Sequence, residues 1–222
     1  MDPASILTAT DYEKPRTPAE FLKWWMSIHN AYGATKAGRD YCRASRALTK
    51  RFYEEAQVLL AFVQAYYRNA DVLCHLHAGS GADDALIEDR RSRKKKAFQL
   101  TFAADSHNEH FRSMELSRTG SVDALAKPIV VVSGRKRSIV FPEQEAIDHS
   151  EVVSEIVQLL KARLSQKEEK KYGSPTALVV GFDDGFIDDA DVRHFRAAYD
   201  GSFPELFFVG LHGRIAIPSK EA

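Results

Sequence analysis

The chain has 222 residues, of which 44% are hydrophobic and 28% are charged, and its formal net charge is zero. This is the composition of an ordinary globular protein, and the zero net charge excludes a global electrostatic argument for nucleic-acid binding, so only local clusters can support one. The two cysteines form no CxxC pair, and we expect them to be reduced. Since the sequence has neither a long apolar run nor a signal-peptide pattern, we expect a cytoplasmic protein without a membrane span.

The N-terminal part is expected to be an extended arm followed by helices. Residues 1–16 contain two prolines and little periodicity. Thr17 is placed to cap a helix, Pro18 fits its first position and Glu20 completes a capping box. This helix should end near Gly33. A second, longer helix should cover residues 40–67, with an apolar stripe formed by Leu48, Phe52, Leu59, Phe62 and Tyr66.

Strands and helices alternate in the rest of the chain. Residue patterns predict strands over 71–78, 85–88 and 97–103, a hairpin over 129–132 and 138–141, and helices over 106–116, 150–167 and 190–199. The apolar run 176–182 is typical of a strand buried on both faces, and strands over 206–211 and 214–217 follow. This order predicts an α/β protein with a central mixed sheet flanked by helices. Residues 1–40 would form an N-terminal arm and helix, and residues 41–222 the α/β domain.

Candidate site residues stand at three points of this pattern. Glu55 falls inside the apolar stripe of the long helix, where a carboxylate is costly to bury unless it is paired or bound to a metal; alternatively, it lies at a wet edge or pairs with an arginine. Asp84 directly precedes a strand, where it either faces a site or serves as a plain turn residue. Gln99 and Thr101 share one face of the segment "FQLTFA", and a half-exposed sheet face would explain them without chemistry.

The chain presents a helical glutamate, then an aspartate at a strand start, and then a strand with a polar-x-polar pair. This order resembles the core of the restriction-endonuclease-like fold, the PD-(D/E)xK nuclease superfamily. The segment "DDALIE" looks like the family's "PDAII", with Asp83 in the proline position, and "FQLTFA" looks like its "IEVKxA". The resemblance covers residues 48–119. It implies that Glu55 and Asp84 hold Mg²⁺, which hard oxygen ligands suit, and that Gln99 assists.

The sequence departs from this family at both positions of the final pair. Gln99 stands where the family has an acid, and Thr101 stands where it has the catalytic lysine. Gln99 can still offer a carbonyl oxygen, whereas Thr101 cannot replace a cation. Because some family members carry the lysine on another element, the candidates for it are Lys96 on the same strand and Lys161 on a later helix.

Two basic clusters support contact with nucleic acid. They lie at the tips of two expected hairpins and consist of Arg90, Arg91, Arg93, Lys94 and Lys95 in the first and Arg135, Lys136 and Arg137 in the second. Basic projections beside a metal site would hold the phosphates of DNA or RNA. The alternative is that both are solvated tips, as charge runs often are.

Two functions from different classes follow. The first is a nuclease-like protein that binds DNA or RNA and, if active, hydrolyses phosphodiester bonds with Mg²⁺. The second is a catalytically inactive interaction protein that retains the fold, which the departures at Gln99 and Thr101 favour. Trp24 and Trp25 would then offer a surface for a homodimer or another partner, although core packing explains them equally well.

Overall fold

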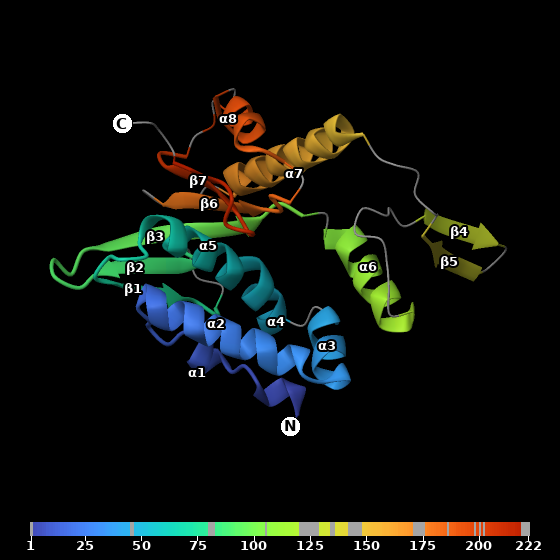
Figure 1. The fold of residues 1–222 in the computed structure, drawn as a ribbon, viewed down its shortest axis with the longest axis horizontal. Coiled ribbons are helices and arrows are strands. Elements are labelled where there is room, and N and C mark those ends of the chain that lie inside the picture. Colours follow the sequence, from blue (N-terminus) through green and yellow to red (C-terminus); the bar gives the residue numbers. More distant parts are fainter. Residues whose placement is uncertain are drawn as a thin grey trace.

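The main sheet contains six strands in the order β1-β2-β3-β6-β7-β8 (Figure 1). The computed structural model describes residues 2–44, 47–79, 83–104, 106–119, 129–133, 136–141, 148–170, 176–185, 187–197, 199, 201 and 203–218. The strands are β1 (Val72–Leu76), β2 (Ala85–Asp89), β3 (Lys95–Phe102), β6 (Ala177–Phe182), β7 (Leu206–Gly210) and β8 (Ala216–Ile217). The first three are antiparallel neighbours, β3, β6 and β7 run parallel, and β8 is antiparallel to β7.

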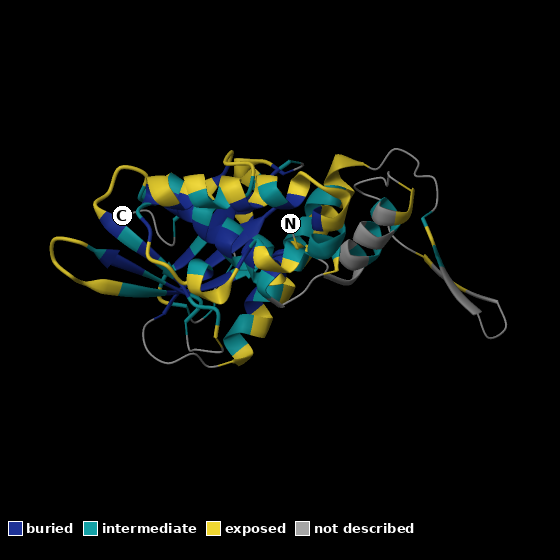
Figure 2. Ribbon diagram, turned by 90° about the horizontal axis from the view of Figure 1, so that it is seen from below, coloured by how far each residue is buried: buried dark blue, intermediate teal, exposed yellow. Residues whose placement is uncertain are grey.

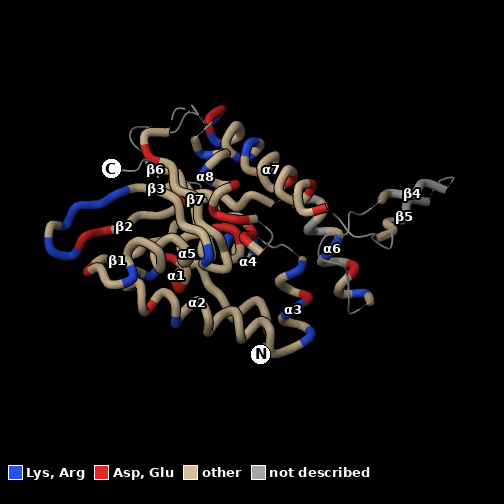
Figure 3. The backbone as a smooth tube through the Cα atoms, turned by 45° about the horizontal axis from the view of Figure 1, so that its top comes forward, with Lys and Arg blue, Asp and Glu red and all other residues tan. Residues whose placement is uncertain are grey.

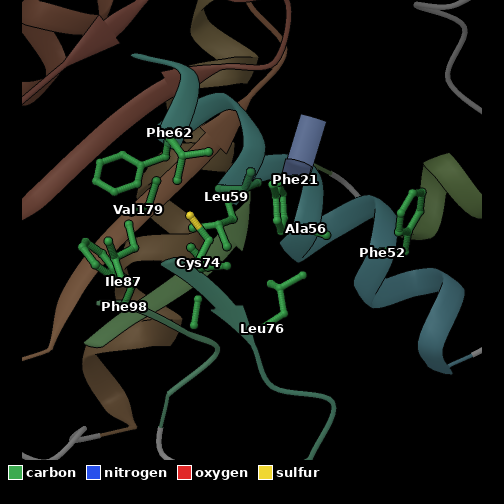
Figure 4. Close-up of a cluster of buried hydrophobic side chains, with 14 of the residues drawn as sticks. Phe21, Phe52, Ala56, Leu59, Phe62, Cys74, Leu76, Ile87, Phe98 and Val179 are labelled. Carbon is green, nitrogen blue, oxygen red and sulfur yellow. The ribbon is translucent and has the colours of Figure 1, made fainter. Parts of the chain in front are cut away.

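Helices lie on both faces of this sheet, so the expected mixed sheet flanked by helices is confirmed (Figure 1). On one face lie α2 (Pro18–Gly33) and α5 (Gln57–Tyr66), and on the other lie α7 (His149–Glu169) and α8 (Asp189–Ala197). Figure 4 shows part of the first core, which includes Phe21 of α2 and Phe62 of α5, and the ring centroids of Phe62 and Phe98 of β3 lie 5.2 Å apart. Gly181 of β6 allows α5 to approach closely, because a Cβ at this position would lie 2.4 Å from Val58.

The strand β6 is buried along its whole length, as its continuous apolar run predicts. Alternate residues of this strand face the two cores: Val179 packs against the α2 and α5 side, and Leu178 and Val180 against the α7 and α8 side. Figure 2 shows this buried centre, with exposed residues on the outer faces of the helices and on the loop that joins β2 to β3. The burial of both faces therefore fixes α5 and α7 on opposite sides of β3 and β6.

The segment between β3 and α7 contains α6 (Ser106–Thr119) and a hairpin of β4 (Ile129–Ser133) and β5 (Lys136–Val140). This hairpin forms a separate two-stranded sheet, which Figure 1 shows apart from the main sheet. Within the described ranges, no helix combines the length and the apolar character needed to span a bilayer.

The N-terminal segment differs from the extended arm expected for it. It contains a 3₁₀ turn, η1 (Pro3–Ser5), and a short helix, α1 (Ala9–Tyr12). Asp2 and Thr8 cap these two turns, because each side chain accepts a hydrogen bond from a backbone N–H of the turn that follows it. Leu7 and Tyr12 are buried in the first core. The expected start of the next helix is confirmed, since Thr17 and Glu20 form the capping box at the start of α2.

The single helix expected over residues 40–67 is wrong, because several shorter elements occupy this stretch. They are α3 (Lys36–Arg43), α4 (Ala47–Arg51), a π-helical turn named η2 (Phe52–Ala56) and α5. The first of them begins before residue 40, because Thr35 caps it by accepting a hydrogen bond from Gly38 N at 3.0 Å. Gly38 lets this helix fold back onto the end of α2, since a Cβ there would lie 2.3 Å from Tyr32 O.

Candidate active site

Glu55 lies on the π-helical turn η2, at the junction of α4 and α5. Its neighbours Phe52 and Ala56 are fully buried in the first core, and the turn packs against β3. Such turns are rare and frequently occur at functional sites. The Glu55 side chain is only 19% exposed. The core contacts of its neighbours therefore hold this carboxylate against the sheet.

The Glu55 carboxylate has few partners among the described residues. Oε2 accepts a hydrogen bond from the Tyr12 hydroxyl at 3.4 Å, and Oε1 lies 4.0 Å from Arg51 Nε. Burial and then the negative charge of Asp84 raise the pKa of Glu55 to about 7, although Arg51 and Lys167 oppose this rise. Asp84 is thus near enough to Glu55 for its charge to act on it, and the ionised form of Glu55 is poorly compensated.

Asp84 enters the site from the start of β2. Its backbone is fixed by the sheet, since Asp84 N donates to Phe98 O and Asp84 O accepts from His77 N, both at 3.0 Å. Its Oδ2 atom accepts hydrogen bonds from Leu100 N at 2.8 Å and from Lys167 Nζ at 3.3 Å. Its side chain is 20% exposed. Asp84 therefore does more than close a turn, because its carboxylate reaches across to β3.

Gln99 lies on β3, on the face opposite to Phe98 and Leu100, which pack into the first core. Its side chain is buried, and its Oε1 atom accepts a hydrogen bond from Lys167 Nζ at 2.9 Å. An amide oxygen is a hard oxygen donor of the kind that suits Mg²⁺. Thr101 lies on the same face, beside Val180 of β6, and adds no charge.

Lys167 completes the cluster from the last turn of α7. Its ammonium group contacts both Asp84 and Gln99, and its side chain is only 13% exposed. Burial lowers the pKa of Lys167, while the charge of Asp84 opposes that change. Lys167 is not among the residues that the sequence patterns led us to expect for this role. The sequence does contain a signal for it. Lys167 follows the buried Leu160 and Leu164 at helical spacing, so it is a charged residue on the buried face of its helix, as Glu55 is on the apolar stripe of its own helix.

The two lysines expected for this role lie elsewhere. Lys96 is on the opposite face of β3 from Gln99, where it pairs with Glu205 and lies over the rings of Phe98 and Phe207 at 5.5 and 5.6 Å. Lys161 is on α7 but is exposed, and it lies six residues before Lys167, which places it on a different face of the helix. The structure joins Asp84, Gln99 and Lys167 through hydrogen bonds, and Glu55 lies close enough for the charges of Asp84 and Lys167 to act on its pKa.

The first basic cluster forms the tip of the β2–β3 hairpin (Figure 3). At about 3.4 Å per residue, Arg90 at the end of β2 lies roughly 20 Å along the strand from Asp84. Acidic side chains pair with most of this cluster: Arg90 and Arg91 with Asp71, and Arg93 and Lys95 with Glu88. The tip therefore does not border the candidate site.

The second basic cluster contributes less to the described structure. Arg135 lies outside the described residues, and Lys136 and Arg137 belong to β5. This hairpin is separate from the main sheet, so no contact with the candidate site follows from it.

The side chains of the site suit a hard divalent cation. The Asp84 carboxylate and the Gln99 amide oxygen both contact Lys167 Nζ, and the charge of Asp84 acts on the Glu55 carboxyl group. Mg²⁺ is commonly bound by one or two carboxylates together with water and phosphate oxygens. No group of three or more His, Cys, Asp or Glu side chains that could hold a metal occurs in the described part of the chain. The strongest argument for a cation is therefore the poorly compensated carboxylate of Glu55 beside Asp84.

Comparison with known proteins identifies no relative. Protein-family models, curated protein sequences and solved structures were compared with the chain, and none of them matches it.

Proposed function

We propose that this chain is a restriction-endonuclease-like nuclease that hydrolyses phosphodiester bonds in DNA or RNA with Mg²⁺. The observation that carries this proposal is the meeting of Asp84, Gln99 and Lys167 through hydrogen bonds, near enough to Glu55 for the charges of Asp84 and Lys167 to act on its pKa. These side chains come from distant parts of the chain. The order of a helical glutamate, a strand-start aspartate and a polar strand residue also supports the resemblance to the PD-(D/E)xK superfamily.

Each side chain has a distinct role in this proposal. Glu55 and Asp84 would hold Mg²⁺, and the Gln99 amide oxygen would add a neutral ligand. When bound, Mg²⁺ supplies a Lewis acid that offsets the charge of the phosphate and lowers the pKa of a water molecule. Lys167 would place a positive charge beside the attacked phosphate, because its ammonium group lies between the carboxylate of Asp84 and the amide oxygen of Gln99.

In this proposal, Lys167 supplies the positive charge that Thr101 cannot supply. The cation would come from α7 instead of β3, and its ammonium group contacts the Asp84 carboxylate. The departure at Gln99 leaves the site with one negative charge fewer than an acid would give. We expect weaker metal binding than in a site with three carboxylates, and activity that is higher with Mn²⁺ than with Mg²⁺, because Mn²⁺ accepts nitrogen and neutral ligands more readily.

The experiment compares the full chain with Asp84→Asn and with the neighbouring variant Asp83→Asn as a matched control. Single- and double-stranded DNA and RNA are incubated with each protein in Mg²⁺, in Mn²⁺ and in EDTA. The proposal predicts metal-dependent cleavage of at least one substrate by the wild type and by Asp83→Asn, and its loss in Asp84→Asn. Absence of cleavage by the wild type, or equal cleavage by Asp84→Asn, would contradict it.

A binding protein without activity is the second candidate. Gln99 and Thr101 favour it, because both positions lack the charged groups found in active members of the resembling family. In that case the wild type would bind nucleic acid, cleave none of the substrates, and bind equally well with EDTA and with metal.

A further inference from the structure

The N-terminal helix α1 ends directly beside the candidate active site. Tyr12, its last residue, is fully buried, and its ring makes an edge contact with Trp24 at a centroid distance of 6.2 Å. The Tyr12 hydroxyl lies 3.4 Å from Glu55 Oε2 and 3.5 Å from the carbonyl oxygen of Arg51. A phenol has one proton to donate, and a charged carboxylate accepts it more strongly than a neutral carbonyl group does.

The segment that carries Tyr12 is held firmly in place. The backbones of Arg16 and Cys74 exchange two hydrogen bonds, at 3.0 and 2.7 Å, which attach this segment to the edge of β1. Glu13 Oε1 accepts a hydrogen bond from Ala78 N at 2.9 Å. These contacts, which directly follow α1 in the chain, therefore hold Tyr12 in place before any ligand binds.

The same region anchors the chain that leads to Asp84. Arg51, one turn before Glu55, donates from Nη1 to the carbonyl oxygens of His77 and Gly79 at 3.1 and 2.8 Å. Its Nε atom is 4.0 Å from Glu55, which is too far for a hydrogen bond. Arg51 thus holds the chain before β2 through its hydrogen bonds to backbone carbonyl groups. The hydroxyl group of Tyr12 donates a hydrogen bond to the Glu55 carboxylate.

We propose that Tyr12 is a positioning residue of this site: its hydroxyl group holds the Glu55 carboxylate beside Asp84, in the orientation that receives a divalent cation. This inference rests on the proposed function, because it takes Glu55 as a ligand. Hydrogen bonds to metal ligands typically contribute about 10–100-fold to metal affinity. The bond from Tyr12 is long, at 3.4 Å, so we expect a contribution near the lower end, about tenfold.

The test measures the dissociation constant of Mn²⁺ by electron paramagnetic resonance of the free ion, with the full chain and without nucleic acid. Tyr12→Phe removes the hydroxyl and keeps the ring. Tyr32→Phe is the matched control, because Tyr32 is equally buried in the same core. We expect about tenfold weaker Mn²⁺ binding by Tyr12→Phe and unchanged binding by Tyr32→Phe. A role in packing alone would shift the unfolding temperature and leave Mn²⁺ affinity unchanged.

Three results would overturn the inference. If the wild type binds Mn²⁺ and Tyr12→Phe binds it equally well, Tyr12 does not position Glu55, and the proposed function still stands. If both variants lose affinity to the same extent, the effect comes from the core and not from the hydroxyl group. If the wild type itself binds no Mn²⁺, the proposed metal site is wrong and the role of Tyr12 is wrong with it.

Discussion

Replacing Glu55 by glutamine should stabilise the folded protein at alkaline pH in the absence of metal. Burial and the charge of Asp84 raise the pKa of Glu55 from 4.5 to about 7. Between these two values the folded protein binds a proton that the unfolded chain has released, so the free energy of unfolding falls as the pH rises through this window. Above pH 7 the folded state carries the full cost of the ionised carboxylate.

The difference between these two pKa values corresponds to a free energy of about 3 kcal/mol at pH 8 and less than about 1 kcal/mol at pH 5. Glu55→Gln removes the ionisation and keeps the shape of the side chain. It should therefore be more stable than the wild type by up to about 3 kcal/mol at pH 8, and close to it at pH 5. This is a large effect, because the total stability of a domain is only about 5–15 kcal/mol.

The assay is urea denaturation at pH 5 and pH 8 in EDTA. The control is Glu54→Gln, since Glu54 is more exposed and has Lys50 beside it, which predicts a smaller change. Mg²⁺ at a hundredfold excess over its dissociation constant should restore about 2.7 kcal/mol to the wild type and nothing to Glu55→Gln. If Glu55→Gln is no more stable than the wild type at pH 8, the Glu55 carboxylate is well compensated and the argument for a bound cation fails.

Three further changes test other parts of the structure. Lys167→Met should reduce cleavage by at least about a hundredfold, as expected for the loss of a positive charge at the reacting group, while Lys161→Met on the exposed side of the same helix should leave the rate unchanged. Asp184→Ala should destabilise the protein by about 2–4 kcal/mol in urea denaturation, because the buried Asp184 carboxylate accepts hydrogen bonds from three backbone N–H groups of the β7–β8 turn; no loss would contradict this role. Arg91→Ala and Lys94→Ala at the hairpin tip should each reduce the salt dependence of nucleic-acid affinity by about one unit of slope, and unchanged slopes would mean that the tip contacts no phosphate.

Local chemistry in the sequence was enough to predict most of the elements that carry the site. Thr17, Pro18 and Glu20 define the start of α2, because a capping box satisfies N–H groups that are exposed at any helix start. The apolar run of β6 predicts a strand that is buried on both faces, and its position in the sheet confirms this. Such features depend on neighbours within a few residues, so a single sequence contains them.

The parts that the sequence did not predict depend on contacts between distant segments. Lys167 lies 68 positions from Gln99, and only the packing of α7 across β3 and β6 brings their side chains together. Lys96 looked suitable because it is on the same strand as Gln99, but alternation along a strand places it on the other face. Tyr12 lies 43 positions before Glu55, in a segment without periodicity, so no pattern linked the two residues.

The most direct test of the proposed site is a crystal of the protein soaked in MnCl₂ and measured at the manganese absorption edge. We expect an anomalous peak in contact with the carboxylates of Glu55 and Asp84, with the Gln99 amide beside it and Lys167 within reach of the bound water molecules. No peak at saturating Mn²⁺, or a peak that contacts neither carboxylate, would contradict the assignment of these residues as a metal-dependent nuclease site.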